Sequence, residues 1–124
     1  MFAAAAVEAG VRRFIQVSTV GIEAADSASV DPEFAVYLKA KKLAEDDLKS
    51  RDLDWTILRP GALVNDAATG LVTLAAPRLP RASVTRADVA AVLAELLNAP
   101  QTIGKTLELT NGETPVVEAV RSVL

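Results

Sequence analysis

The sequence of 124 residues contains neither cysteine nor histidine. Their absence excludes Cys/His zinc sites, Ser-His triads, cysteine nucleophiles and haem attachment. It also excludes disulfide bonds, which is compatible with the cytoplasmic location that we expect. We therefore expect no metal site, and any chemistry must use Tyr, Lys, Ser, Thr, Asp, Glu or Arg side chains.

Long apolar runs and blocks of like charge are missing as well. Apolar residues make up 51% of the chain, yet no uninterrupted run approaches the ~20 residues that span a bilayer. The 13 basic and 16 acidic residues are interspersed and give a net charge of -3, so no broad cationic face is available for phosphate backbones. We expect neither nucleic acid nor membrane as a partner, and the length indicates one domain spanning residues 1–124.

The N-terminal run FAAAAVEA, residues 2–9, is apolar but contains Glu8 and follows no basic segment. We interpret it as a buried helix rather than a secretory signal, ended by a left-handed Gly10.

Short apolar strands then alternate with helices. Asp31 as cap, Pro32 in the first turn and Glu33 predict a helix that runs to about Ser50. Residues 22–30 are small and polar and predict a loop, as do residues 77–82. The other predicted elements are strands at 14–17, 54–58, 71–76 and 105–109, a helix from the Thr85/Asp88 capping box to Leu97, and a terminal helix with Thr114 as cap and Pro115 as first residue.

The unit formed by strand 14–17, helix 31–50 and strand 54–58 is βαβ, so its strands are expected to be parallel with a right-handed crossover. Ligands of such sheets bind beyond the carboxyl ends of the strands. This rule places Ser18, Thr19 and the Pro60-Gly61 turn on one rim. The fold class is therefore α/β.

Tyr37, the only tyrosine, precedes Lys41 by four residues on the predicted helix. Positions four apart share one face, so both side chains can converge on one ligand. An adjacent ammonium stabilises phenolate over phenol, which suits Tyr37 for proton transfer. A hydroxyl of Ser18 or Thr19 could orient a substrate carbonyl or hydroxyl against it. The alternative is a half-buried tyrosine beside a lysine whose stem covers apolar surface.

Other polar groups admit two interpretations each. The functional interpretations are phosphate binding by Arg12-Arg13, metal binding by Glu45 with Asp46-Asp47, and substrate contacts by Asp88 and Asn65-Asp66. For Trp55 the functional interpretation is a stacking platform. We favour the structural interpretations, which are a helix carboxyl end for the arginines, a solvated face for the acidic run, capping and turn chemistry for Asp88 and Asn65-Asp66, and a core position for Trp55.

The segments GVRRFIQVSTVG, YLKAKKLAEDDLKSRDLDWTILRPGAL, TGLVTLA and SVTRADVAAVLAELLNAPQTIGKTLEL, followed by NGETPVVEAV, occur in unbroken order over nearly the whole chain. Together they resemble the later half of atypical short-chain dehydrogenase/reductases, in the branch described as NAD(P)H-binding or NmrA-like and as epimerase, dehydratase or flavin-reductase relatives. The resemblance implies the C-terminal half of a Rossmann-type, doubly wound, mainly parallel sheet with helices on both faces.

The resemblance also implies roles for individual residues. Tyr37 matches the acid/base of the family's Tyr-x-x-x-Lys motif, and Lys41 matches the lysine that holds the nicotinamide ribose. Thr19, with Ser18 beside it, matches the Ser/Thr that orients the substrate. Pro60, Gly61, Ala62 and Leu63 match the turn along the nicotinamide. The implied cofactor is NADP or NAD, and the implied partner is a small-molecule substrate.

One departure from the family is large, since its members begin with a strand and a G-x-x-G-x-x-G turn that receives the pyrophosphate. Here the six glycines are isolated and form no such motif. We expect about 80 to 90 N-terminal residues of such a domain to be absent, leaving strand 14–17 as an exposed apolar edge open to self-association.

Three interpretations of function are consistent with these features. The chain is a truncated oxidoreductase or epimerase-like protein, weak or inactive alone; a non-catalytic redox-sensing or regulatory module; or the product of a wrongly started reading frame.

Overall fold

The computed structural model describes residues 2–25 and 30–124; part of the predicted 22–30 loop therefore lies outside the described residues. Its helices are α1 (Phe2–Ala9), α2 (Pro32–Lys49), α3 (Arg86–Leu97) and α4 (Val116–Arg121), with short 3-10 helices η1 (Ile22–Ala24) and η2 (Pro100–Thr102). Its strands are β1 (Arg13–Val17), β2 (Asp54–Pro60), β3 (Ala62–Val64), β4 (Leu71–Ala75), β5 (Ser83–Thr85), β6 (Thr106–Asn111) and β7 (Thr114–Pro115).

The main sheet has five strands in the order β1-β2-β6-β4-β7. β1, β2 and β6 are parallel, which confirms the predicted βαβ unit, whereas β4 runs antiparallel to β6 and β7. β3 and β5 form a separate parallel pair that the sequence did not predict. The sheet is therefore mixed, with β1, β2 and β6 parallel to one another and the β4 pairings antiparallel.

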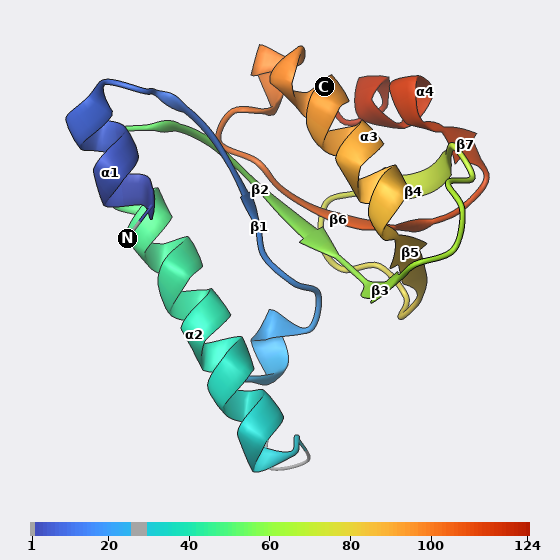
Figure 1. Cartoon of the computed structure of the whole chain (residues 1–124), viewed down its shortest axis with the longest axis horizontal. Coiled ribbons are helices and arrows are strands. Elements are labelled where there is room, and N and C mark those ends of the chain that lie inside the picture. The colour runs from blue at the N-terminus through green and yellow to red at the C-terminus, as the bar shows by residue number, and fades with distance from the viewer. Residues whose placement is uncertain (1, 26–29) are drawn as a thin grey trace.

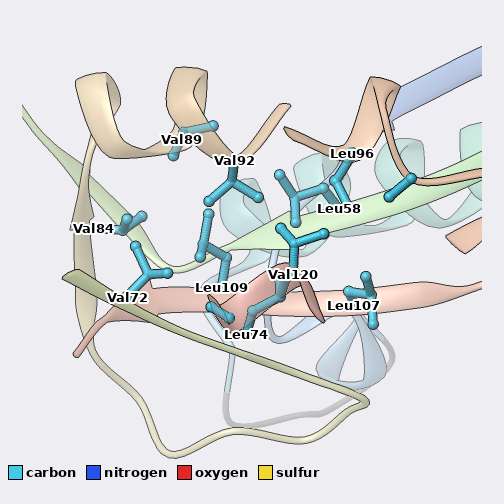
Figure 2. Packing of buried hydrophobic residues seen from close by; sticks show 12 residues of the cluster. Leu58, Val72, Leu74, Val84, Val89, Val92, Leu96, Leu107, Leu109 and Val120 are labelled. Atoms are coloured by element: carbon cyan, nitrogen blue, oxygen red, sulfur yellow. The ribbon is translucent and has the colours of Figure 1, made fainter. Parts of the chain in front are cut away.

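Helices cover both faces of the sheet, as expected for a doubly wound fold (Figure 1). α1 and α2 lie on one face, and α3 and α4 on the other. Successive strand residues point to opposite faces, so Ile57 packs with Ala3 and Leu48 while Leu58 packs beneath α3 and α4. Figure 2 shows the larger core, in which side chains of α3 point towards those of β2, β4 and β6.

The same alternation gives β2 and β6 a polar side. Thr56 and Leu58 face the α3 side, so Arg59 points towards α2, and Glu108 likewise points away from its neighbours Leu107 and Leu109 in the larger core. Two charged side chains of adjacent strands therefore meet on the α2 side of the sheet.

Asp31 is the N-cap residue of α2, as predicted, but its side chain makes no capping hydrogen bond; its backbone carbonyl accepts from Ala35 N at 2.8 Å. The predicted start of the terminal helix is wrong. Thr114 is no cap because it pairs with Val72 of β4, which keeps residues 114 and 115 extended and delays α4 to Val116. Pro32 in the first turn of α2 and the Thr85/Asp88 capping box are confirmed.

The expectation of a buried N-terminal helix is wrong for most of α1. Ala3 is its only buried residue, and Phe2 is 80% exposed. The helix packs only a small-residue edge on the α2 side of the sheet, so its larger side chains remain at the surface. Gly10 follows it with a φ of 74°, as predicted.

Strand β1 lies at the edge of the sheet and pairs only with β2 within the described residues, as the sequence predicted. Arg13 does reach a helix carboxyl end, but that of α3, where it donates to Leu96 O at 3.0 Å. Arg12 instead pairs with Asp52 at 3.1 Å. Trp55 packs against the smaller hydrophobic cluster, formed by Ala3, Leu48, Leu53 and Ile57, as expected. None of the helices described is both long and apolar enough for a membrane span.

Candidate functional site

A cleft of about 950 Å³ opens beyond the carboxyl ends of β1 and β2. Because these strands are parallel and in register, the chain segments that come after them stay side by side. Ser18 N donates to Leu58 O at 2.7 Å, and Val20 N donates to Pro60 O at 3.2 Å. The predicted common rim of Ser18, Thr19 and Pro60-Gly61 is confirmed.

The cleft collects residues from distant parts of the sequence. Its lining residues come from the turn after β1, from α2, from the segment after β2 that includes β3, and from the loop of residues 77–82. Its lining includes seven of the predicted site residues: Ser18, Thr19, Tyr37, Pro60, Gly61, Ala62 and Leu63.

Lys41 is the predicted site residue that does not line the cleft. Its ammonium donates to Val17 O at 3.4 Å, at the end of β1, and lies 5.8 Å from the centroid of the Tyr37 ring. Tyr37 and Lys41 therefore share one face of α2, one turn apart, as their spacing predicted.

Tyr37 is 44% exposed and faces the cleft. Its ring stacks on Phe34 at a centroid separation of 5.7 Å, with 26° between the ring planes. Phe34 thus packs against the ring, and the Lys41 ammonium lies nearby. A ligand in the cleft can thus reach the Tyr37 side chain.

The two hydroxyls after β1 have different surroundings. Thr19 is half-buried, and its Oγ1 donates to Val20 O at 3.2 Å. Ser18 is only 4% exposed, and its hydroxyl is shielded beside the carboxylate of Glu45. Thr19 is accordingly the more accessible of the two to a ligand.

Gly61 has a packing role at the base of the cleft. A Cβ at this position would collide with the backbone carbonyl of Ala82, so only glycine lets the 77–82 loop approach the end of β2. Its N–H donates to Leu109 O at 2.9 Å. The next two residues, Ala62 and Leu63, are exposed towards the cleft.

A buried ionic network lies behind the cleft, centred on Arg59. Its guanidinium makes a two-point contact with Glu45, with Nε 2.9 Å from Oε2 and Nη2 2.7 Å from Oε1. Nη1 lies 3.1 Å from Glu23 Oε1 and 3.7 Å from Glu108 Oε2. Glu108 Oε1 also accepts from Leu79 N at 2.9 Å. One arginine therefore joins η1, α2, β6 and the 77–82 loop.

This geometry shifts the pKa values of Arg59 and Glu45, the two partners of the two-point contact. Hydrogen bonding to Glu45 raises the pKa of Arg59, and the charges of Glu23 and Glu108 act in the same direction. Burial alone would raise the pKa of Glu45, but the hydrogen bonds and the charge of Arg59 outweigh it and hold that pKa below its ordinary value. Both groups are ionised at neutral pH.

The network was missed by the sequence interpretation, which assigned Glu45 to a solvated face together with Asp46 and Asp47. Asp46 and Asp47 do lie outward, in pairs with Lys42 and Arg51. Glu45 is only 2% exposed. The helical spacing did indicate a buried position for Glu45. It lies seven residues after Leu38 and three before Leu48, so it shares a helix face with two leucines that are both buried.

Asp88 forms a second polar centre, away from the Tyr37 side of the cleft. The structural interpretation of capping is confirmed, since Asp88 N donates to Thr85 Oγ1 at 3.0 Å. Its carboxylate also accepts from Thr69 N, from Gly70 N at 2.9 Å and from Asn111 Nδ2 at 2.7 Å. Burial opposes ionisation, but these donors together with Thr85 hold the pKa of Asp88 well below its ordinary range.

Known proteins share both the sequence and the fold. A family model described as NAD(P)H-binding matches residues 1–100. The uncharacterized sugar epimerase YhfK of Bacillus subtilis is 36% identical over 96% of this chain and 54% of its own length. The chain thus spans about half the length of this relative.

Solved structures extend the comparison. A candidate NAD-dependent epimerase/dehydratase of Bacillus halodurans superposes with a TM-score of 0.90 at 43% identity, over 98% of this chain and 56% of that one. ChuY of Escherichia coli O157:H7, described as an anaerobillin reductase, gives a TM-score of 0.76 at 36% identity over 86% of this chain and 53% of its own. The chain belongs to the NAD(P)H-binding family, with a Rossmann-like fold shared with epimerase/dehydratase-like proteins.

Proposed function

We propose that this chain supplies the nicotinamide-facing and substrate-facing part of an NAD(P)-dependent oxidoreductase or epimerase. Tyr37 is the general acid/base, Lys41 binds the nicotinamide ribose, and Thr19 with Ser18 orients a small-molecule substrate. Pro60, Gly61, Ala62 and Leu63 lie along the nicotinamide ring. The observation that carries the proposal is that Tyr37, Thr19 and the Pro60–Leu63 turn line one cleft.

The cleft fits a nicotinamide ring together with a small substrate. Its volume of about 950 Å³ lies near the upper end of the range of about 300 to 1,000 Å³ typical of small-molecule sites. Pro60 and Gly61 are buried at its base, and Leu63 offers an apolar surface for a flat ring. When bound, the cofactor supplies hydride transfer.

The protein residues handle the accompanying proton. Tyr37 is held by Phe34 and reaches the cleft, so its hydroxyl can give a proton to a substrate carbonyl oxygen or remove one from a substrate hydroxyl. The Lys41 ammonium lies near the same ring, 5.8 Å from its centroid. Thr19 is placed to hydrogen-bond the same substrate oxygen.

Phosphate binding is the weak part of the proposed site. The six glycines are isolated, so the sequence contains no glycine-rich turn of the kind that receives a dinucleotide pyrophosphate. We infer that the 124 residues alone bind NADPH or NADH weakly, with most affinity coming from the nicotinamide end.

Replacing Tyr37 with phenylalanine tests the catalytic role. We expect the chain to oxidise NADPH at millimolar concentration with at least one member of a panel of small aldehydes and ketones. Tyr37→Phe should lower kcat/KM by about 100-fold or more, because general acid/base catalysis contributes about that factor. NADPH consumption followed by absorbance measures the rate.

Lys41→Met is expected to raise KM for NADPH, and Lys42→Met is its matched control because Lys42 pairs with Asp46 at the surface. A rate that survives Tyr37→Phe would exclude the acid/base role. NADPH binding that is unaffected by Tyr37→Phe, with no turnover of any carbonyl compound, would favour the regulatory module instead.

A further inference from the structure

Three arginines line the cleft, namely Arg78 and Arg81 of the 77–82 loop and Arg86 at the start of α3. All three are exposed. Arg86 donates from Nε to Asn65 Oδ1 at 2.8 Å, which engages only one nitrogen of its guanidinium. Arg78 and Arg81 have no hydrogen-bond or ion-pair partner within residues 2–25 and 30–124. Within the part of the chain that the structure describes, the cleft therefore presents guanidinium groups that no carboxylate pairs with.

The carboxylates of the cleft do not neutralise these arginines. Among the described residues, only Glu23 and Glu108 contribute carboxylates to its lining, and both lie against Arg59. Glu108 also accepts from the backbone of Leu79. The described residues of the cleft wall thus carry an excess of positive charge, although the chain as a whole has a net charge of -3.

The arginines sit on a wall that is fixed at several points. Leu79 N donates to buried Glu108, and the Ala82 carbonyl packs against Gly61. Immediately afterwards β5 pairs in parallel with β3, with Ser83 opposite Ala62. The loop therefore presents Arg78 and Arg81 to the cleft from a backbone anchored to the site itself.

We propose that the substrate carries a carboxylate or phosphate group that Arg78, Arg81 and Arg86 bind at the cleft wall. Guanidinium forks match the geometry of these anions and form charge-assisted hydrogen bonds with them. The placement of the substrate's reacting carbon next to Tyr37 rests on the proposed function. The anion site itself does not, because it is built from other residues.

The test is an NMR titration of the chain, observing arginine Nε–Hε resonances at constant ionic strength. The probes are inorganic phosphate and malonate, with chloride as the control anion. We expect saturable shifts of Arg78, Arg81 and Arg86 with phosphate or malonate and none with chloride. If phosphate binds more tightly than malonate, the substrate anion is a phosphate; if malonate binds more tightly, it is a carboxylate. Shifts spread equally over all arginines, or none at all, would overturn the proposal.

Variants give an independent readout. The double variant Arg78→Gln/Arg81→Gln should weaken phosphate or malonate binding by at least about tenfold, since each charge-assisted hydrogen bond contributes about that factor. Arg121→Gln is the matched control, because Arg121 is exposed at the end of α4 and does not line the cleft. Equal losses in the two variants would overturn the proposal.

Two further binding measurements distinguish a substrate-anion site from a cofactor site, and distinguish this inference from the proposed function. If the double variant loses affinity for NADP⁺ by the same factor as for phosphate, the arginines serve the cofactor and the substrate assignment is wrong. Tyr37→Phe should bind both anions like the unaltered chain. Saturable anion binding by a chain whose turnover is absent, or survives Tyr37→Phe, would refute the proposed function alone. Turnover that depends on Tyr37 in a chain that binds neither anion would refute this inference alone.

Discussion

Arg59 is the residue on which the shape of the cleft depends most. It is only 8% exposed and lies close to three carboxylates from three different elements, with a two-point contact to Glu45. A buried guanidinium is tolerated only when its charge is paired and its donors are satisfied. Through Glu108 and Leu79 the same group fixes the loop that presents Arg78 and Arg81.

Removing the Glu45 charge should therefore destabilise the folded chain. We expect Glu45→Gln to lower the free energy of unfolding by about 3 kcal/mol, because breaking a buried ion pair leaves its partner partly uncompensated. Urea denaturation measures the change. Asp46→Asn is the matched control on the same helix: its pair with Lys42 is exposed, so its effect should stay within about 0.5 kcal/mol. Similar losses in both variants would contradict the network's role.

At the residue scale, the sequence predicted the positions that a strand end or a helical spacing determines directly. Thr19 and Gly61 come after adjacent parallel strands, and Tyr37 and Lys41 lie one turn apart, so local rules place them together. The pairing of Glu45 with Arg59 depends on how α2 packs across the sheet, which no local pattern contains. In addition, Glu45 precedes two solvated aspartates that disguise its buried position.

Asp88 shows how one side chain joins several elements. It caps the start of α3 with Thr85, accepts from the backbone of Thr69 and Gly70 before β4, and accepts from Asn111 at the end of β6. The carboxylate is fully buried. Its hydrogen bonds are all to uncharged groups, so the ionised form depends on these donors alone.

This arrangement makes the junction sensitive to acid. The pKa of Asp88 is lowered in the native state, whereas the unfolded chain takes up this proton near pH ~3.9. Below that pH the unfolded state binds more protons, so stability falls as the pH falls towards the native pKa. We expect the chain to be more stable than Asp88→Asn by about 2 kcal/mol at pH 7.

That difference should shrink steadily below about pH 4, because the stabilising effect of the ionised form is lost there. Urea denaturation of both proteins between neutral and acidic pH measures it. A difference that stays constant with pH would show that the native carboxylate does not titrate as described.

At the element scale, the helices at 32–49 and 86–97 and the strands of five to seven residues were predicted, whereas the shortest strands were missed. The span of α2 and the parallel pairing of β1 with β2 are determined by apolar spacing and by the intervening helix. β3 and β5 have three residues each, too few for a period of two to be visible. The antiparallel direction of β4 and the extended Thr114-Pro115 were missed because both depend on pairing partners distant in sequence.

The whole molecule combines a sheet edge with an open cleft. β1 lies at the edge and pairs only with β2 among the described strands. Self-association through this edge stays a prediction, as does the identity of the substrate. The cleft lined by α2 and the 77–82 loop unites the residues proposed for nicotinamide contact, proton transfer and anion binding.

The central claim is that this cleft receives the nicotinamide end of the cofactor, and backbone amide NMR mapping with the two cofactor halves tests it most directly. Reduced nicotinamide mononucleotide should shift the amides of Thr19, Tyr37, Gly61, Ala62 and Leu63, whereas AMP at the same concentration should shift none of them. NADPH should shift the same amides with little gain in affinity. Unchanged cleft amides with the nicotinamide half, or micromolar affinity for NADPH, would contradict the proposed site.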